Sequence, residues 1–162
     1  MKNSFFVSKI DDINLRKYKI NLKDYKQDVK KILELLFSYD EIKTSKIFSP
    51  DISKIRFDIS FCNDDTIHKI NKDYRKKDRP TDVITFSLFV DDENPIIYRK
   101  TADLGQIIIS IETANKQKTD TLKKELLTLT THGILHLFGF DHLEKKDYDF
   151  VVGIQNKVIK NF

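Results

Sequence analysis

Residues 131–142 read Thr-His-Gly-Ile-Leu-His-Leu-Phe-Gly-Phe-Asp-His, and they contain three of the four histidines in the chain. If this stretch is helical, His132 and His136 lie one turn apart on the same face, with Cβ atoms about 5–6 Å apart. Gly139 follows three residues after His136, where a left-handed glycine commonly ends a helix and reverses the chain. We therefore expect His142 to return to the two helical histidines.

Three converging histidines predict a metal site. Three imidazole nitrogens at about 2.0–2.1 Å from a tetrahedral ion leave a fourth position for water, as in catalytic zinc sites. Histidine ligands also suit copper, iron and nickel, so the pattern predicts that a metal binds but does not determine which metal it is. The alternative is three histidines satisfied by ordinary hydrogen bonds. The third histidine after a glycine turn favours one Zn²⁺ per chain, bound by His132, His136 and His142.

The spacing His-x3-His-x5-His is also that of the extended metzincin protease signature. Those proteases carry a glutamate general base directly after the first histidine, and this chain has Gly133 there. The ligand spacing is kept but the base is missing, which argues against a peptidase.

Length and composition indicate one globular domain, residues 1–162, in the cytoplasm. The chain is 40% hydrophobic and 33% charged, as expected for a soluble protein with a single core. The single cysteine, Cys62, has no disulfide partner within the chain and lies in an apolar run, which predicts a small buried hydrophobic residue. We expect no signal peptide and no membrane span, because no apolar stretch is long enough.

Basic residues are concentrated in one segment. The chain has a net charge of +4, and residues 69–79 alone contain six basic and two acidic residues, a local excess of the same size. A solvated helix face is the usual explanation for such a run. The members are Lys69, Lys72, Arg75, Lys76, Lys77 and Arg79, with Asp73 and Asp78.

Several segments have the patterns of β-strands. Apolar and polar residues alternate over 55–61, which is typical of a half-buried strand. Residues 82–90 are rich in branched and aromatic side chains, and 104–111 form an almost continuous apolar run, typical of a central strand buried on both faces. We also expect a short edge strand at 5–7, an extended fragment at 17–20 and a loop or hairpin at 91–103.

Helical periodicity separates these strands. An amphipathic helix over 22–39 begins after Asn21, which is placed to cap it and cover one face of a sheet. A short helix follows residue 64, with Ile67, Ile70 and Tyr74 on its apolar side and His68 as a surface residue. The histidine-bearing helix, 122–137, has apolar residues that anchor it in the core. Further helices are expected at 112–118 and at 145–160, the latter with Tyr148 on its apolar face.

Three parts of the chain together resemble the YbeY family of bacterial endoribonucleases, the rRNA maturation factors. They are Asn71 with Tyr74–Phe86, then Leu104-Gly105, then His132–His142, in this order. The resemblance implies an α/β (α+β) fold, with one mixed sheet of about four strands and the zinc-site helix in the core. It also implies a cytoplasmic, zinc-dependent endoribonuclease specific for single-stranded RNA, acting in maturation of the small-subunit rRNA 3′ end and in ribosome quality control. The implied partners are rRNA and the ribosome or its small subunit.

By position, the resemblance implies that His132, His136 and His142 bind zinc and that Arg75 is the functional arginine of a Tyr-Arg motif. Such an arginine can contact a phosphate through two parallel hydrogen bonds, which lysine cannot reproduce. The alternative is a surface arginine paired with Asp73 or Asp78. The chain departs from the family pattern at Ser87, where proline is common, at Gln106, where aspartate is usual, and at Phe140, where tyrosine is usual.

Asp141 is the carboxylate nearest to the histidines in sequence, and it is a candidate catalytic residue. It either orients a histidine, which is the commoner role, or accepts a proton from water. No other residue is an obvious general base, so attack by water and attack by the 2′-hydroxyl of RNA both remain open. Two other functions also remain open. One is a ribosome-assembly RNA-binding protein with a structural zinc, and the other is a metal-dependent hydrolase of peptides or small amides.

Overall fold

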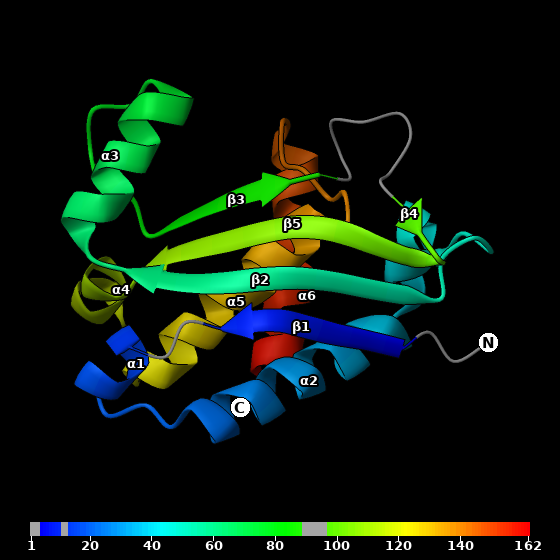
Figure 1. The fold of residues 1–162 in the computed structure, drawn as a ribbon, viewed down its shortest axis with the longest axis horizontal. Coiled ribbons are helices and arrows are strands. Elements are labelled where there is room, and N and C mark those ends of the chain that lie inside the picture. Colours follow the sequence, from blue (N-terminus) through cyan, green and yellow to red (C-terminus); the bar gives the residue numbers. More distant parts are fainter. Residues whose placement is uncertain (1–3, 11–12, 89–96) are drawn as a thin grey trace.

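A computed structural model describes residues 4–10, 13–88 and 97–162, which form one mixed sheet with helices (Figure 1). The strand order is β1-β2-β5-β3, and the short β4 also pairs with β5. β1, β2 and β5 are parallel, whereas β3 and β4 are antiparallel to β5. The strands are β1 (Ser4–Ile10), β2 (Lys54–Cys62), β3 (Val83–Ser87), β4 (Ile97–Tyr98) and β5 (Thr101–Ser110).

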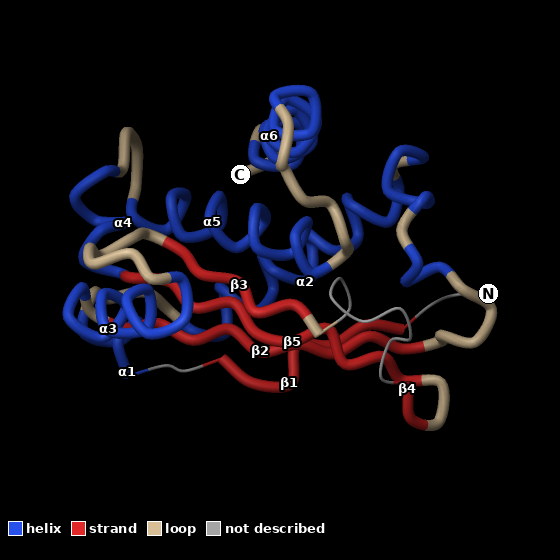
Figure 2. The backbone as a smooth tube through the Cα atoms, turned by 90° about the horizontal axis from the view of Figure 1, so that it is seen from above, coloured by secondary structure: helices blue, strands red, loops and turns tan. Residues whose placement is uncertain are grey.

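Helices cover mainly one face of this sheet. Figure 2 shows α2 and α5 lying along that face, with α6 on the far side of α5 from the sheet. The α-helices are α1 (Ile13–Lys17), α2 (Leu22–Ser38), α3 (Asp64–Arg75), α4 (Ile111–Gln117), α5 (Leu122–Leu137) and α6 (Lys145–Ile159). Two 3₁₀ turns, Asp40–Thr44 and Lys46–Phe48, follow α2. The predicted α/β architecture with one mixed sheet is therefore confirmed.

The main core is formed by the covered face of the sheet together with α2, α5 and α6. In β2 the odd-numbered residues from Ile55 to Phe61 are buried and the residues between them are not, so the strand has one covered and one largely solvated face. Tyr25 of α2 is fully buried, and its hydroxyl lies 2.6 Å from that of Thr130 in α5. This contact joins the first long helix to the histidine-bearing one. A second, smaller cluster of Ile67, Ile84 and Ile108 lies under α3.

Most helices form where periodicity predicts them. The Asn21 side chain accepts a hydrogen bond from the Asp24 amide at 3.1 Å, which confirms the predicted cap of α2. Cys62 is half-buried with no disulfide, and burial raises the pKa of its thiol to about 11. No helix in the described part of the chain has an apolar stretch long enough to cross a bilayer.

One expectation for local structure is wrong, and the bounds of two predicted strands differ from those in the structure. Residues 17–20 are not extended, because they end α1 and continue into a turn in which Lys19 has φ of 59°. β3 ends at Ser87, and the rest of the predicted strand, from residue 89 on, lies outside the described residues. β5 begins at Thr101, where it pairs with β4, and this pairing confirms a hairpin in the later part of 91–103.

Candidate metal centre

The three clustered histidines come from α5 and the turn that follows it. α5 ends in a Schellman motif, in which Gly139 has φ of 94° and its amide donates to the His136 carbonyl at 3.0 Å. The Phe140 amide donates to the Leu135 carbonyl, also at 3.0 Å. This left-handed reversal, which the sequence predicts at Gly139, turns the chain back so that His142 faces the helix it has just left.

The imidazoles of His132, His136 and His142 converge. Their ring centroids are 4.7 to 5.4 Å apart, and one nitrogen of each lies within 4.8 Å of the others. The Nε2 atoms of His132 and His136 are 3.0 Å apart. Nitrogens around a tetrahedral ion at 2.0–2.1 Å would be separated by roughly 3.4 Å. The donor set therefore fits a small cation with few adjustments.

Burial favours the neutral forms of the His132 and His136 rings. Burial, with smaller contributions from His132, His142 and Arg75, lowers the pKa of His136 to about 4. Burial also lowers the pKa of His132, although its hydrogen bond with Gln155 opposes the shift. A neutral imidazole keeps the lone pair that a metal requires, so no proton has to be removed from these two rings before metal binds at neutral pH.

Two polar side chains contact the imidazoles from outside the cluster. Nδ1 of His132 lies 3.0 Å from Oε1 of Gln155 in α6, so a proton on Nδ1 directs Nε2 toward the other rings. Asp141 Oδ1 lies 3.8 Å from Nδ1 of His136 and accepts a hydrogen bond from the His142 amide at 2.7 Å. Gln155 was missed by sequence reasoning. The available signal was a glutamine four residues after Val151, on the buried stripe of α6.

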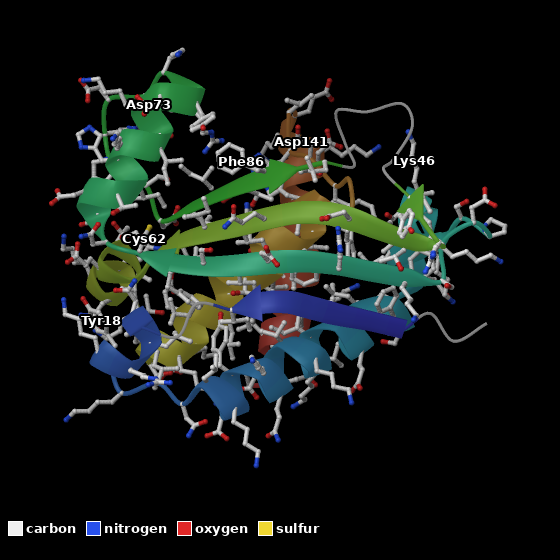
Figure 3. All side chains as sticks on the ribbon, in the orientation of Figure 1. Tyr18, Lys46, Cys62, Asp73, Phe86 and Asp141 are labelled. Atoms are coloured by element: carbon white, nitrogen blue, oxygen red, sulfur yellow. The ribbon has the colours of Figure 1, made fainter. Side chains whose placement is uncertain are left out.

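A pocket of about 360 Å³ opens over the histidines. One wall is β3, where Val83, Thr85 and Ser87 alternate with residues facing the other side of the sheet. Figure 3 labels Asp141 beside the end of β3. The full lining is Arg75, Thr81, Asp82, Val83, Thr85, Ser87, His132, His136, Asp141 and His142.

The pocket contains every residue that the sequence singled out for the site, and three polar residues that it did not mark, Thr81, Asp82 and Thr85. Asp82 is a second carboxylate in the lining, and its Oδ2 accepts a hydrogen bond from Gln117 at 3.1 Å. Thr81 lies beside it. The sequence places Thr81 in a turn and Asp82 at the start of the strand predicted over 82–90, and it assigns neither to the site because nothing local shows that β3 lies next to α5.

Arg75 reaches the pocket from the last turn of α3. The alternative of a simple surface ion pair is not supported. Asp78 instead contacts His68 at 2.7 Å and Lys72 at 3.0 Å, and no described carboxylate forms an ion pair with Arg75. The His68 contact lies at the surface, as expected for the histidine outside the cluster.

Two of the three departures from the family pattern lie outside the pocket lining. Gln106 donates from Nε2 to Ser60 Oγ in β2 at 2.8 Å, and Phe140 packs against Phe150 with ring centroids 5.4 Å apart. Ser87, in contrast, is part of the lining.

Gly133 has a packing reason to be glycine. A Cβ at this position would lie 2.7 Å from Cγ2 and 2.9 Å from Cδ1 of Ile107, which is fully buried in β5. α5 can approach the sheet this closely because residue 133 has no side chain. At the position where metzincin proteases carry their glutamate base, the side chain of the core residue Ile107 leaves no room for a side chain.

Comparisons with known proteins show the family of the chain. The family described as Endoribonuclease YbeY matches residues 12–162. An Endoribonuclease YbeY from Oenococcus oeni is 36% identical over 138 residues, covering 83% of this chain and 84% of the relative. One from Bacillus pumilus is 33% identical over 147 residues, covering 86% and 87%.

A solved structure has the same fold. The solution structure of TM1509 from Thermotoga maritima aligns with a TM-score of 0.54 and 25% identity, over 96% of this chain and 87% of that one. The family match and the curated relatives each extend over most of the chain. The chain therefore belongs to the YbeY family of endoribonucleases.

Proposed function

We propose that this protein is a zinc-dependent endoribonuclease that cleaves single-stranded RNA. The observation that carries the proposal is the shared pocket, which three mutually close imidazoles line together with Arg75. His132, His136 and His142 would hold one zinc ion. Bound zinc can lower the pKa of water to about 7 and polarise a phosphoryl oxygen, and both effects assist phosphodiester cleavage.

The protein's own residues provide positioning and charge. Arg75 binds a phosphate oxygen pair of the substrate and stabilises the charge that develops there, because a planar guanidinium matches that geometry. Gln155 fixes which nitrogen of His132 faces the pocket. Asp141 orients His136 and the chain around His142, since its Oδ1 lies near His136 Nδ1 and accepts a hydrogen bond from the His142 amide. We assign Asp141 this orienting role rather than proton transfer.

Family membership supports a proposal for the biological setting. The substrate we propose is ribosomal RNA, specifically the 3′ end of the small-subunit rRNA, with a further role in ribosome quality control. The partner would be the ribosome or its small subunit, in the cytoplasm. The described basic residues between Lys69 and Arg79 support an RNA substrate over a peptide, because the same end of α3 supplies Arg75 to the pocket.

The test measures metal content and cleavage on the same preparations. Wild type should bind about one zinc per chain and cleave a single-stranded fragment of small-subunit rRNA. His136→Ala should lose zinc, and cleavage should fall by about 10²–10⁴-fold, corresponding to several kcal/mol of charge stabilisation. His68→Ala, the matched control, removes the surface histidine paired with Asp78 and should leave zinc content and cleavage unchanged.

Two outcomes would contradict the proposal. If wild type cleaves equally well after its zinc has been removed, the metal has no part in the reaction. If wild type binds zinc and RNA but never cleaves, and His136→Ala melts far below wild type, the protein is an RNA-binding factor with a structural zinc. A peptide-substrate screen with the same preparations covers the remaining hydrolase alternative.

A further inference from the structure

Tyr74 does not occupy the place that helical periodicity predicts. The pattern puts it on the apolar side of α3 with Ile67, and Ile67 is indeed fully buried. Tyr74, the next-to-last residue of the same helix, is instead 71% exposed. Exposing a tyrosine this fully forgoes the stabilisation that its burial would give, so the position invites a functional explanation.

The ring of Tyr74 is nevertheless held in place. It meets the ring of Phe86 in β3 nearly edge to face, with centroids 5.2 Å apart and planes at 75°. Figure 3 labels Phe86 at β3, beside α3. Phe86 lies between Thr85 and Ser87, which both line the pocket, and its own side chain is on the other face of β3, against the cluster of Ile67, Ile84 and Ile108. The contact therefore fixes an exposed aromatic ring at the edge strand that forms the pocket wall.

The surroundings of this ring are cationic. Arg75, the next residue, lines the pocket. Of the two acidic residues between Lys69 and Arg79, Asp78 is already engaged by His68 and Lys72, which leaves Asp73 alone among the basic residues; none of the described carboxylates pairs with Lys77 or Arg79. A fixed, exposed aromatic ring within a positive field fits a strand that carries phosphates and unstacked bases. A protein partner would also favour tyrosine and arginine, but it would have to present a matching acidic surface.

We propose that Tyr74 stacks on an unpaired nucleobase of the RNA while Arg75 binds an adjacent phosphate. This inference rests on the proposed function and deepens it by naming a base subsite beside the phosphate contact. Bases within a duplex are already stacked on each other, whereas bases of a single strand are free to stack on an aromatic side chain. Tyr74 would therefore contribute to the preference for single strands.

The absence of tryptophan from the chain provides a direct probe. Tyr74→Trp places a single fluorophore at the proposed subsite, and stacking of a base should quench its emission. The matched control is Tyr98→Trp. Tyr98 is 69% exposed and has the Arg99 guanidinium 5.2 Å from its ring centre, but it lies in β4, at the opposite end of the sheet from α3 (Figure 1).

Binding is measured with short single-stranded RNA in the presence of a chelator, so that it does not depend on cleavage. We expect saturable quenching for Tyr74→Trp and none for Tyr98→Trp. Tyr74→Leu should weaken single-strand binding by about 5- to 100-fold, which corresponds to the loss of one stacked base. Tyr74→Phe and Tyr98→Leu should bind like wild type, and duplex binding should change little in any variant.

The inference is overturned if Tyr74→Leu, with wild-type circular dichroism and melting temperature, binds single strands as tightly as wild type. It is equally overturned if Tyr98→Leu loses as much affinity, or if RNA leaves the emission of Tyr74→Trp unchanged. Protein contact would then be the better explanation of the exposed ring. Quenching without any cleavage by zinc-loaded wild type would leave the base subsite standing and refute the proposed nuclease function alone.

Discussion

The two walls of the pocket differ in how they are built. The α5 wall is held from behind, because His132 contacts Gln155 of α6 and residue 133 packs on β5. The α3 wall is exposed from Lys72 through Pro80, and its helix ends with Lys76 in a left-handed conformation at φ of 57°. Fixed neutral rings suit a small ion that demands accurate geometry, whereas solvated cations suit a flexible polymer.

The largest expected effect is a loss of zinc affinity, on the α5 wall, that leaves RNA binding by the α3 wall unchanged. Gln155→Leu removes the acceptor that orients His132, and loss of such a partner typically weakens metal affinity by about 10–100-fold. We expect competition titrations with a zinc chelator to show this loss. RNA binding without metal should remain at the wild-type level, because Gln155 lies on the other side of α5 from α3.

Arg75→Lys should give the opposite result. Zinc affinity should be unchanged, whereas cleavage should fall and single-strand binding should weaken, because lysine cannot form the paired contact with phosphate. Gln155→Glu retains an acceptor oxygen and serves as the control for the first variant. Equal effects of Gln155→Leu and Arg75→Lys on zinc and on RNA would show that the two walls do not have separate roles.

An intermediate effect concerns the rigidity of the α5 wall. Gly133→Ala places a methyl group 2.7 Å from Ile107, and such overpacking should destabilise the fold by about 1–3 kcal/mol. The same change at Gly153, in α6, meets no atom within 4 Å and should stabilise by about 0.5–1 kcal/mol through helix propensity. Chemical denaturation measures both, and equal changes would mean that α5 can move away from β5.

The smallest effect concerns Asp64, in the first turn of α3, which is bound by Ser110, Thr113 and Lys116. Burial opposes ionisation of Asp64, but hydrogen bonds from Lys116, Ser110 and Thr113 outweigh it and lower its pKa to about 2. Because this folded-state pKa lies below the ordinary value of 3.8, the carboxylate stabilises the fold at neutral pH. We expect a contribution of about 1–2 kcal/mol, lost as the pH falls from about 4 to 2.

Unfolding of wild type and Asp64→Asn between pH 2 and 6 measures that contribution. The stability difference between the two proteins should shrink as the pH falls. A difference that stays constant over this range would show that the Asp64 charge does not hold α3.

The sequence predicts best where structure is local. Helical periodicity locates α5 within residues 122–137, and the spacing of His132, His136 and Gly139 predicts the convergence of three rings. It predicts less well where tertiary packing decides. The contact of Gln155 with His132 joins two helices, and periodicity cannot show which faces of α5 and α6 meet.

Exposure is also poorly predicted at the ends of helices. Tyr74 and Tyr148 both fit an apolar stripe, yet they are 71% and 50% exposed. Both lie near the ends of their helices, Tyr74 at the end of α3 and Tyr148 at the start of α6. Tyr148 instead meets the His142 ring at 5.6 Å. Periodicity describes which side of a helix a residue occupies, but it does not tell where the neighbouring layer stops.

The close contact between Gly133 and Ile107 also limits how this scaffold could change its chemistry. A glutamate at position 133 would require replacement of the opposing Ile107 by a smaller residue at the same time. With the glutamate alone the core would be overpacked, and with the smaller residue alone it would contain a cavity. A peptidase and this nuclease architecture are thus separated by a double substitution with unstable single steps. Directed-evolution libraries that vary one codon at a time would not be expected to cross that barrier.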